Sequence, residues 1–115
     1  MEIDVAAVKG RLECDDDLLI EIWEAFCEDA PQLLIGLRSA LDREDLGTIE
    51  RQAHSLKGSS ANIGADTFRM VASDMELSAR RGDLAGTRAM YPPLADGLNR
   101  VLEELTGLLA LYRTR

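Results

Sequence analysis

The stretch DLGTIERQAHSLKGSSANIG, residues 45–64, decides how this chain folds. Its apolar and small residues recur at spacings of three and four, which is the pattern of the buried face of an amphipathic helix. These positions are Leu46, Ile49, Ala53, Leu56, Ser60 and Ile63. Asp45 precedes the pattern as an N-cap, and Gly64 follows it as a stop signal. The stretch therefore predicts one helix from about Asp45 to Asn62.

Helical patterns also cover most of the remaining chain, in the segments 4–13, 16–42, 66–82 and 84–112. No window alternates with a period of two over enough residues to make a strand. Loops of two to four residues cannot span a helix length, so consecutive long helices must pack antiparallel. The sequence predicts an all-α fold, an antiparallel up-down four-helix bundle with a short extra N-terminal helix across one end. A single domain is expected to span residues 1–115.

Aspartates and prolines mark the expected helix boundaries. The acidic run 15–17 offers an N-cap and favourable charge at the start of the second helix, and Asp66 is expected to cap the fourth. Pro31 removes a backbone donor, so it should kink the second helix or split it in two. The pair Pro92-Pro93 should bend the last helix.

Composition bounds the kind of protein. A chain of 115 residues can bury one core but not two, and its 46% hydrophobic and 30% charged content is typical of a globular domain. The first residues, Met1-Glu2-Ile3-Asp4, do not have the basic region and apolar run of a signal peptide, so none is expected. No apolar run is long enough for a membrane segment. Cys14 and Cys27 are too few for a zinc site and fit a reducing compartment, so we expect a cytoplasmic protein. The net charge of −8 argues against nucleic acid and anionic membranes as partners.

The chain's one histidine, His54, lies on the helix of the opening stretch. At about 100° per residue it projects roughly 130° away from the centre of the buried stripe. Lys57 and Gly58, three and four residues later, share its outward face. A local basic zone is expected around it in this acidic protein, made of Arg51, Lys57, Arg69, Arg80 and Arg81. Such a zone is a candidate site for a compact anion.

An exposed imidazole in this setting is suited to nucleophilic chemistry. Its unperturbed pKa of about 6.5 leaves a large neutral fraction near pH 7, and a neutral ring can attack phosphorus without a general base. One helical turn is about 5.4 Å, so the Lys57 ammonium can reach an anion on the His54 ring. Gly58 removes bulk beside the ring, and glycine inside a helix costs about 1 kcal/mol relative to alanine. The glycine on this face would allow the active site of a second protein to close over His54.

The run His54-Ser55-Leu56-Lys57-Gly58-Ser59, followed by Ala61-Asn62-Ile63-Gly64-Ala65, resembles the signature of histidine-containing phosphotransfer (HPt) domains. The segments EDAPQLL at 28–34 and RGDL at 81–84 are also similar to this family, so the resemblance covers nearly the whole chain. It implies a four-helix bundle that relays a phosphoryl group between aspartates of response-regulator receiver domains. Hybrid sensor histidine kinases are the other implied partners, and no cofactor is implied.

By this resemblance each residue of the motif receives a role. His54 is the phosphorylated residue, Lys57 stabilises the phosphoryl group, and Gly58 clears the docking surface. We expect Arg51, Ser55 and Ala61 to belong to the same partner-docking surface. Such a protein is a phosphoryl carrier that its partners use as a substrate, so it is not an enzyme in the narrow sense.

Glu76 departs from the pattern of many family members, which place a glutamine on the next helix to hydrogen-bond the unphosphorylated ring nitrogen. A carboxylate there would fix the tautomer of His54, as carboxylates do for metal-bound histidines. It would also repel an incoming phosphate. The alternative is that Glu76 and Arg80, four residues apart, form an exposed helix pair worth a few tenths of a kcal/mol.

Two other function classes compete with phosphotransfer. A non-catalytic helical interaction or scaffold module would leave His54 without a role and would take up no phosphoryl group. A di-iron bundle needs Glu-x-x-His pairs on facing helices, which one histidine cannot supply, so no metal site is expected. Kinase activity is excluded because there is no glycine-rich nucleotide loop. One bundle uses all the apolar stripes, so a monomer is expected.

Overall fold

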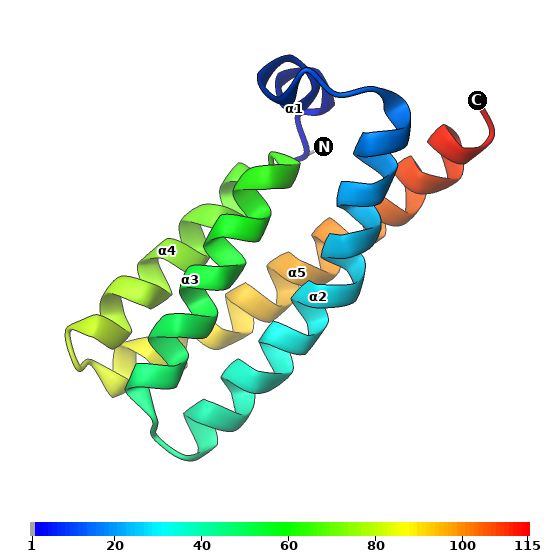
Figure 1. Ribbon diagram of the computed structural model, residues 1–115. Helices are drawn as coiled ribbons and strands as arrows, with labels where there is room; N and C mark the ends of the chain where they lie inside the picture. The colour runs from blue at the N-terminus through cyan, green and yellow to red at the C-terminus, as the bar shows by residue number, and fades with distance from the viewer. Residues whose placement is uncertain (1) are drawn as a thin grey trace.

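The computed structural model describes residues 2–115, and within that range the chain forms five α-helices (Figure 1). They are α1 (Val5–Leu12), α2 (Asp16–Asp42), α3 (Leu46–Ile63), α4 (Asp66–Arg80) and α5 (Leu84–Arg113). The only β-type pairing in the described residues is one antiparallel bridge between Ile3 and Ala65. The prediction of an all-α fold is confirmed.

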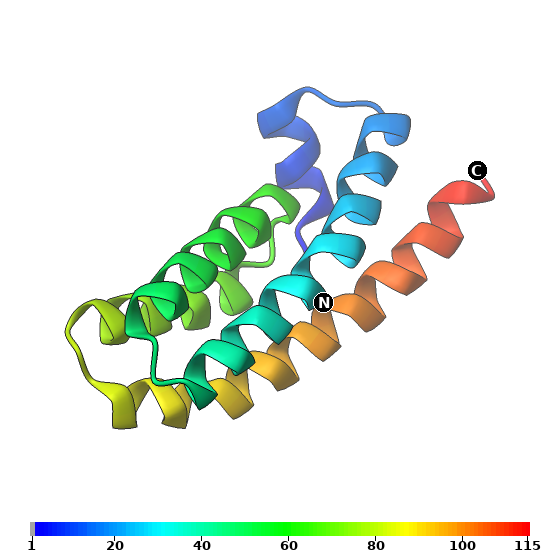
Figure 2. The same cartoon turned by 60° about the horizontal axis from the view of Figure 1, so that its bottom comes forward.

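The four long helices pack side by side with alternating direction, and α1 lies across one end of the bundle (Figures 1 and 2). At that end α2 and α5 extend beyond the shorter α3 and α4, so the molecule is elongated, with extents of 46 × 22 × 20 Å. Loops of two or three residues join the four helices and enforce this antiparallel order. The predicted up-down topology is confirmed.

Aspartate caps start three of the long helices. The carboxylates of Asp15, Asp45 and Asp83 each accept a hydrogen bond from a backbone N–H of the first turn of α2, α3 and α5, respectively. The prediction that Asp66 caps α4 is wrong, because Ala65 is the N-cap and Asp66 is already helical. The side-chain acceptor for that first turn comes instead from Glu2, far away in the sequence.

The N-terminal segment ties this end of the bundle together. The Glu2 carboxylate accepts the backbone N–H of Phe68 at 2.5 Å, which satisfies a donor of the first turn of α4. The backbone N–H groups of Glu2 and Ile3 in turn donate to the Glu104 carboxylate on α5, at 3.1 and 3.0 Å. The residues before α1 therefore link α4 to α5.

The prolines do not interrupt their helices. Helix α2 is continuous through Pro31, and α5 is continuous through Pro92-Pro93, so the alternative of a split second helix is wrong. The buried residues Ala30 and Leu37 lie on either side of Pro31. Their packing in the core keeps the helix in place although proline removes one backbone hydrogen bond.

The core runs along the inner faces of the four long helices. Its largest fully buried side chains are Trp23, Phe68, Leu19, Leu37, Ile49, Leu56, Ile63, Met75, Leu94, Leu98, Leu105 and Val8. Five of the six positions of the predicted α3 stripe are buried, and Leu46 packs partly against the core. Cys27 on α2 is half-buried. Burial raises the pKa of its thiol.

Gly64 ends α3 and lets α1 approach. Its φ of 74° is in the left-handed region, as expected at the end of a helix, and a Cβ there would lie 2.8 Å from Val8 Cγ2. Next to it, Arg11 of α1 donates to the backbone carbonyl of Ala61 at 2.8 Å. The short helix thus covers the carboxyl end of α3 and fixes the helix that carries His54.

Candidate functional site

His54 lies near the middle of α3 and projects toward solvent, as its position on the helix predicts. Its side chain is 66% exposed, while Ala53 and Leu56 on the same helix are fully buried. The ring is nevertheless held on one side, because Nδ1 lies 2.7 Å from Oε2 of Glu76 on the neighbouring α4. The helix pattern sets the direction of His54, and the packing of α4 against α3 sets the rotation of its ring.

Glu76 is a buried carboxylate that contacts several donors. Its side chain is only 6% exposed. Lys57 Nζ lies 2.5 Å from Oε1, and Arg80 Nη2 lies 3.2 Å from Oε2. Burial by itself raises the pKa of this carboxyl, but hydrogen bonds from Lys57 and His54 outweigh it and hold the Glu76 pKa below its ordinary value. Glu76 is therefore ionised near neutral pH.

An ionised carboxylate can only accept hydrogen bonds, which determines the tautomer of the ring. Nδ1 must carry the proton that it donates to Glu76, so in the neutral ring Nε2 holds the lone pair. Since Glu76 occupies the Nδ1 side of the ring, Nε2 is the nitrogen directed toward the exposed side. The arrangement is an oriented imidazole nucleophile with a lysine one turn away.

Arg80 extends this network back to α3. Its Nε donates to Glu50 Oε2 at 3.0 Å, while its Nη2 contacts Glu76. The guanidinium therefore spans the two helices one turn before His54. A shallow pocket of the surface beside the imidazole is lined by Glu50, Arg51, His54, Ser55, Glu76 and Arg80.

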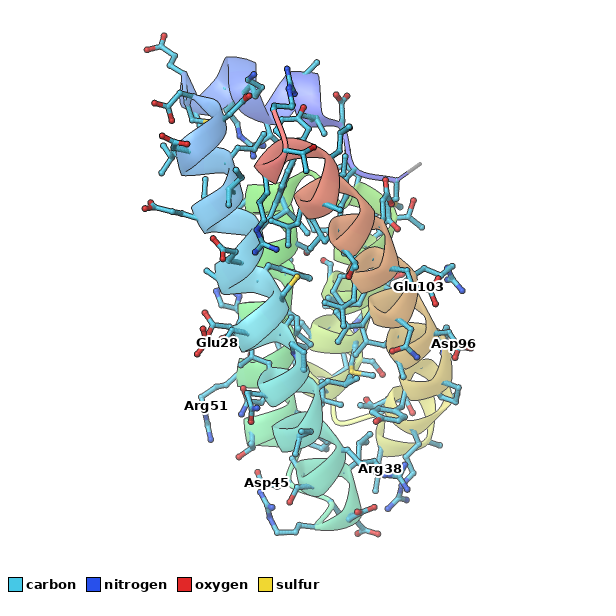
Figure 3. The ribbon with its side chains drawn as sticks, turned by 90° about the vertical axis from the view of Figure 1, so that its right-hand side faces the viewer. Glu28, Arg38, Asp45, Arg51, Asp96 and Glu103 are labelled. Carbon is cyan, nitrogen blue, oxygen red and sulfur yellow. The ribbon has the colours of Figure 1, made fainter. Side chains whose placement is uncertain are left out.

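The predicted docking residues are not all in the same place. Gly58 and Ser55 are exposed on α3, and no atom lies within 4 Å of a Cβ built on Gly58. Arg51 is also exposed and donates to Thr48 Oγ1 at 2.9 Å; Figure 3 shows it projecting from the same side of the bundle as Glu28. Ala61 is half-buried, and its carbonyl is occupied by Arg11 of α1.

The predicted basic zone is smaller than the sequence suggests. Arg69 lies 3.8 Å from Asp66 within α4, and Arg81 lines a different hollow together with Asp83 and Met90. Neither arginine lines the pocket beside His54. Arg81 follows Arg80 by one residue, so its side chain points in a different direction around the helix axis. Lys57, Arg51 and Arg80 are the cations that remain close to the ring.

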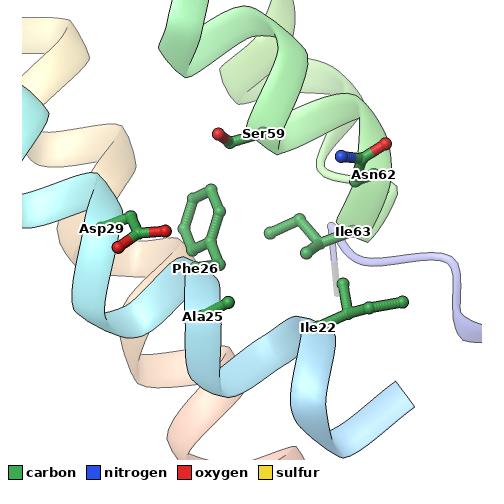
Figure 4. Close-up of a pocket in the computed structure, with 7 residues that line it drawn as sticks. All are labelled: Ile22, Ala25, Phe26, Asp29, Ser59, Asn62 and Ile63. Atoms are coloured by element: carbon green, nitrogen blue, oxygen red, sulfur yellow. The ribbon is translucent and has the colours of Figure 1, made fainter. Parts of the chain in front are cut away.

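A second hollow lies on the other side of α3, between that helix and α2. It is lined by Ile22, Ala25, Phe26, Asp29, Ser59, Asn62 and Ile63 (Figure 4). Asp29 is the one residue there that is charged at neutral pH, and the lining contains no histidine, lysine or cysteine side chain. His54 and Lys57 of α3 therefore face α4, where they contact Glu76, and not this hollow.

Glu50 is the part of the network that sequence reasoning missed. The spacing of Glu76 and Arg80 indicates a helix pair, but no local pattern links Glu50 on α3 to Arg80 on α4. In residues 2–115 no group of three or more His, Cys, Asp or Glu side chains could hold a metal ion. None of the helices in that range is both long and apolar enough to cross a membrane.

Comparisons with known proteins agree on one family. Residues 21–110 match the family model of the Hpt domain. Histidine-containing phosphotransfer protein B of Pseudomonas aeruginosa superimposes with a TM-score of 0.89 at 26% identity, covering 96% of both chains. The Hpt domain of a hybrid histidine kinase from Shewanella has the same fold, with a TM-score of 0.84 at 18% identity over 96% of this chain and 95% of that one.

A curated relative adds a similarity in sequence. The phosphorelay intermediate protein rdeA of Dictyostelium discoideum is 23% identical over 94 residues, which are 82% of this chain. The matched region spans 37% of that protein's own length.

Proposed function

Because this chain belongs to the Hpt domain family, the histidine-containing phosphotransfer domains of phosphorelays, we propose that His54 is its phosphoryl acceptor. One observation supports this assignment above the others. His54 is an exposed imidazole whose Nδ1 is held by a buried carboxylate, at 2.7 Å from Glu76. That contact leaves Nε2 unprotonated and accessible to a partner's phosphoryl group.

The proposed step is an exchange between an acyl phosphate and the ring. Nε2 of His54 attacks phosphorus, an N–P bond forms, and the P–O bond to the partner's aspartate breaks. The electron pair of that bond returns to the aspartate, which leaves as a carboxylate. The ring keeps its Nδ1 proton and becomes cationic, and Glu76 stabilises this charge through the short contact. No proton has to be removed, so the site needs no general base.

Lys57 and Gly58 support this step in different ways. In this structure the Lys57 ammonium donates to Glu76. Lys57 lies one helical turn from His54, so its ammonium can move to a phosphoryl group on the ring. Gly58 keeps the adjoining surface low, so that a partner's active site can approach. We propose Arg51 and Ser55, both exposed beside His54, as further docking residues. Ala61 contributes at most its half-buried methyl group, since its carbonyl is bonded to Arg11.

The proposed partners are receiver domains of response regulators and a hybrid sensor histidine kinase. We infer that residues 1–115 act as one module that carries the phosphoryl group and depends on its partners' active sites for the chemistry. Two free cysteines are consistent with a reducing cytoplasm. The net charge of −8 disfavours nucleic acid and anionic membranes as partners. We expect the module to act as a monomer.

The test compares wild-type protein with His54→Gln. Both are incubated with a phosphorylated receiver domain and, separately, with the small donor phosphoramidate. We expect acid-labile, base-stable phosphate on the wild-type protein and none on the variant. Circular dichroism and the melting temperature should be unchanged, because His54 is exposed. Phosphate of this type on the variant would refute the assignment, and no uptake by the wild type would favour the scaffold alternative.

A further inference from the structure

Two anions compete for the Lys57 ammonium in a phosphotransfer cycle, the Glu76 carboxylate and the phosphoryl group on His54. In this structure the ammonium lies on Oε1 of Glu76, whereas the proposed function requires it to neutralise a phosphoryl group on His54. We propose that Arg80, anchored by Glu50, is the permanent counter-ion of Glu76 and thereby frees Lys57 to move to the phosphoryl group. This inference rests on the proposed function and adds two positioning residues, Arg80 and Glu50, to it.

The two oxygens of the Glu76 carboxylate accept hydrogen bonds from different donors. Among residues 2–115, Lys57 is the one donor to Oε1, whereas Oε2 accepts from both His54 and Arg80. When Lys57 leaves, Oε1 loses its donor but the carboxylate keeps a cation at Oε2. This matters because the Glu76 side chain is only 6% exposed, and a buried carboxylate without a counter-ion is strongly unfavourable.

Glu50 holds the Arg80 side chain in contact with Glu76. The Arg80 side chain is 57% exposed and would lose rotamer freedom on being held by Glu76 alone. Its Nε contacts Glu50 at 3.0 Å and its Nη2 contacts Glu76 at 3.2 Å. A planar guanidinium that satisfies both carboxylates lies across the α3–α4 groove in a fixed orientation. Glu50 thus restrains the arginine to one position.

The two cations consequently differ in mobility. Lys57 has a single carboxylate partner and a flexible stem, so it can exchange one anion for another. Arg80 is bonded on two sides and stays. Without Arg80, only the cationic ring of phosphorylated His54 would remain to balance Glu76 when Lys57 leaves. Lys57 would then be held more strongly on Glu76, in competition with the phosphoryl group.

The experiment measures the lifetime of phosphohistidine after labelling with phosphoramidate, in Arg80→Gln, Glu50→Gln, Lys57→Gln and the double variant at 57 and 80. Arg80→Gln should shorten the half-life by about two- to fivefold, the range that a largely exposed ion pair supplies. Glu50→Gln should shift it in the same direction by a smaller factor. The double variant should be no shorter-lived than Lys57→Gln, because Arg80 acts through Lys57.

The control is Arg88→Gln, which removes the ion pair between Arg88 of α5 and Glu44 of the loop between α2 and α3. Neither residue lines the pocket beside His54. Its half-life should equal that of the wild type. If Arg80→Gln and Lys57→Gln have additive effects, Arg80 acts independently of Lys57 and the proposal is wrong. An unchanged half-life in Arg80→Gln would also overturn it. Should that variant fail to fold, Arg80→Lys provides a second test, since a lysine lacks the planar fork with which Nε and Nη2 contact the two carboxylates.

A second readout does not depend on phosphorylation. In the unphosphorylated protein, the Lys57 ammonium protons should exchange with water more slowly in Arg80→Gln than in the wild type, as measured by NMR. Unchanged exchange would contradict the proposal even if phosphorylation succeeds. Failure of the wild type to be labelled at His54 would instead contradict the proposed function, so the two failures are distinguishable.

Discussion

Gly58 offers a sharp test of the docking surface, because stability and function should respond to its substitution in opposite directions. A Cβ at this position meets no atom within 4 Å, so Gly58→Ala introduces no clash. The gain is then the helix-propensity difference of about 1 kcal/mol. Unfolding entropy of about 2.1 cal/mol/K per residue converts this, for 115 residues, into a melting temperature about 4 °C higher.

A longer side chain at this position separates folding from docking. Gly58→Gln should keep most of the stability gain, since glutamine is also a good helix former. Its amide would stand beside the imidazole where a receiver's aspartate has to approach. A misplacement of about 1 Å can slow a reaction by about a hundredfold, and we expect a loss of that order in transfer from a receiver. Labelling by phosphoramidate, which needs less clearance, should survive.

Two other glycines provide matched controls. Gly107 lies exposed on α5, and its Cβ would also meet nothing within 4 Å, so Gly107→Ala should stabilise equally and Gly107→Gln should leave transfer unchanged. At Gly97 a Cβ would lie 3.2 Å from Phe68 Cδ1, so alanine there should gain less or destabilise. Melting is followed by circular dichroism, and transfer by rapid-quench labelling. A lower melting temperature in Gly58→Ala, or wild-type transfer in Gly58→Gln, would refute the reasoning.

Three further predictions concern the charged side chains of Lys57, Glu76 and Glu2. Lys57→Ala should slow transfer and shorten the phosphohistidine lifetime while receiver binding changes little; equal lifetimes would show that Lys57 only neutralises Glu76. Because the Glu76 pKa is lowered in the folded protein, its stabilising effect is present above about pH 4.5 and is lost as the pH falls through the folded pKa. In denaturant titrations followed by Trp23 fluorescence, acid should therefore destabilise the wild type more than Glu76→Gln, and parallel pH profiles would contradict this. Glu2→Ala removes the acceptor of the Phe68 N–H and should cost about 1 kcal/mol, a few degrees in thermal melts; an unchanged melt would mean that water replaces Glu2.

The sequence by itself determined the helices and the direction of His54. Both follow from short-range rules, because an apolar spacing of three and four fixes which face of a helix is buried. The caps at Asp15 and Asp45 could be predicted for the same reason, since a cap acts over three residues. The motif from His54 to Gly58 also lies within two turns of one helix, so its geometry is nearly independent of the rest of the chain.

Only the tertiary structure decided how the imidazole is held. Glu76 is buried and contacts Nδ1 because α4 packs against α3 with one particular register, and helix periodicity along either segment does not specify that register. The same holds for Glu50, whose partner Arg80 is 30 residues away, and for Glu2, which replaces the expected Asp66 at the start of α4. A local pattern fixes the direction of a side chain along its own helix. The partner that it meets depends on how separate helices are placed against each other, which is set by the packing of the whole core.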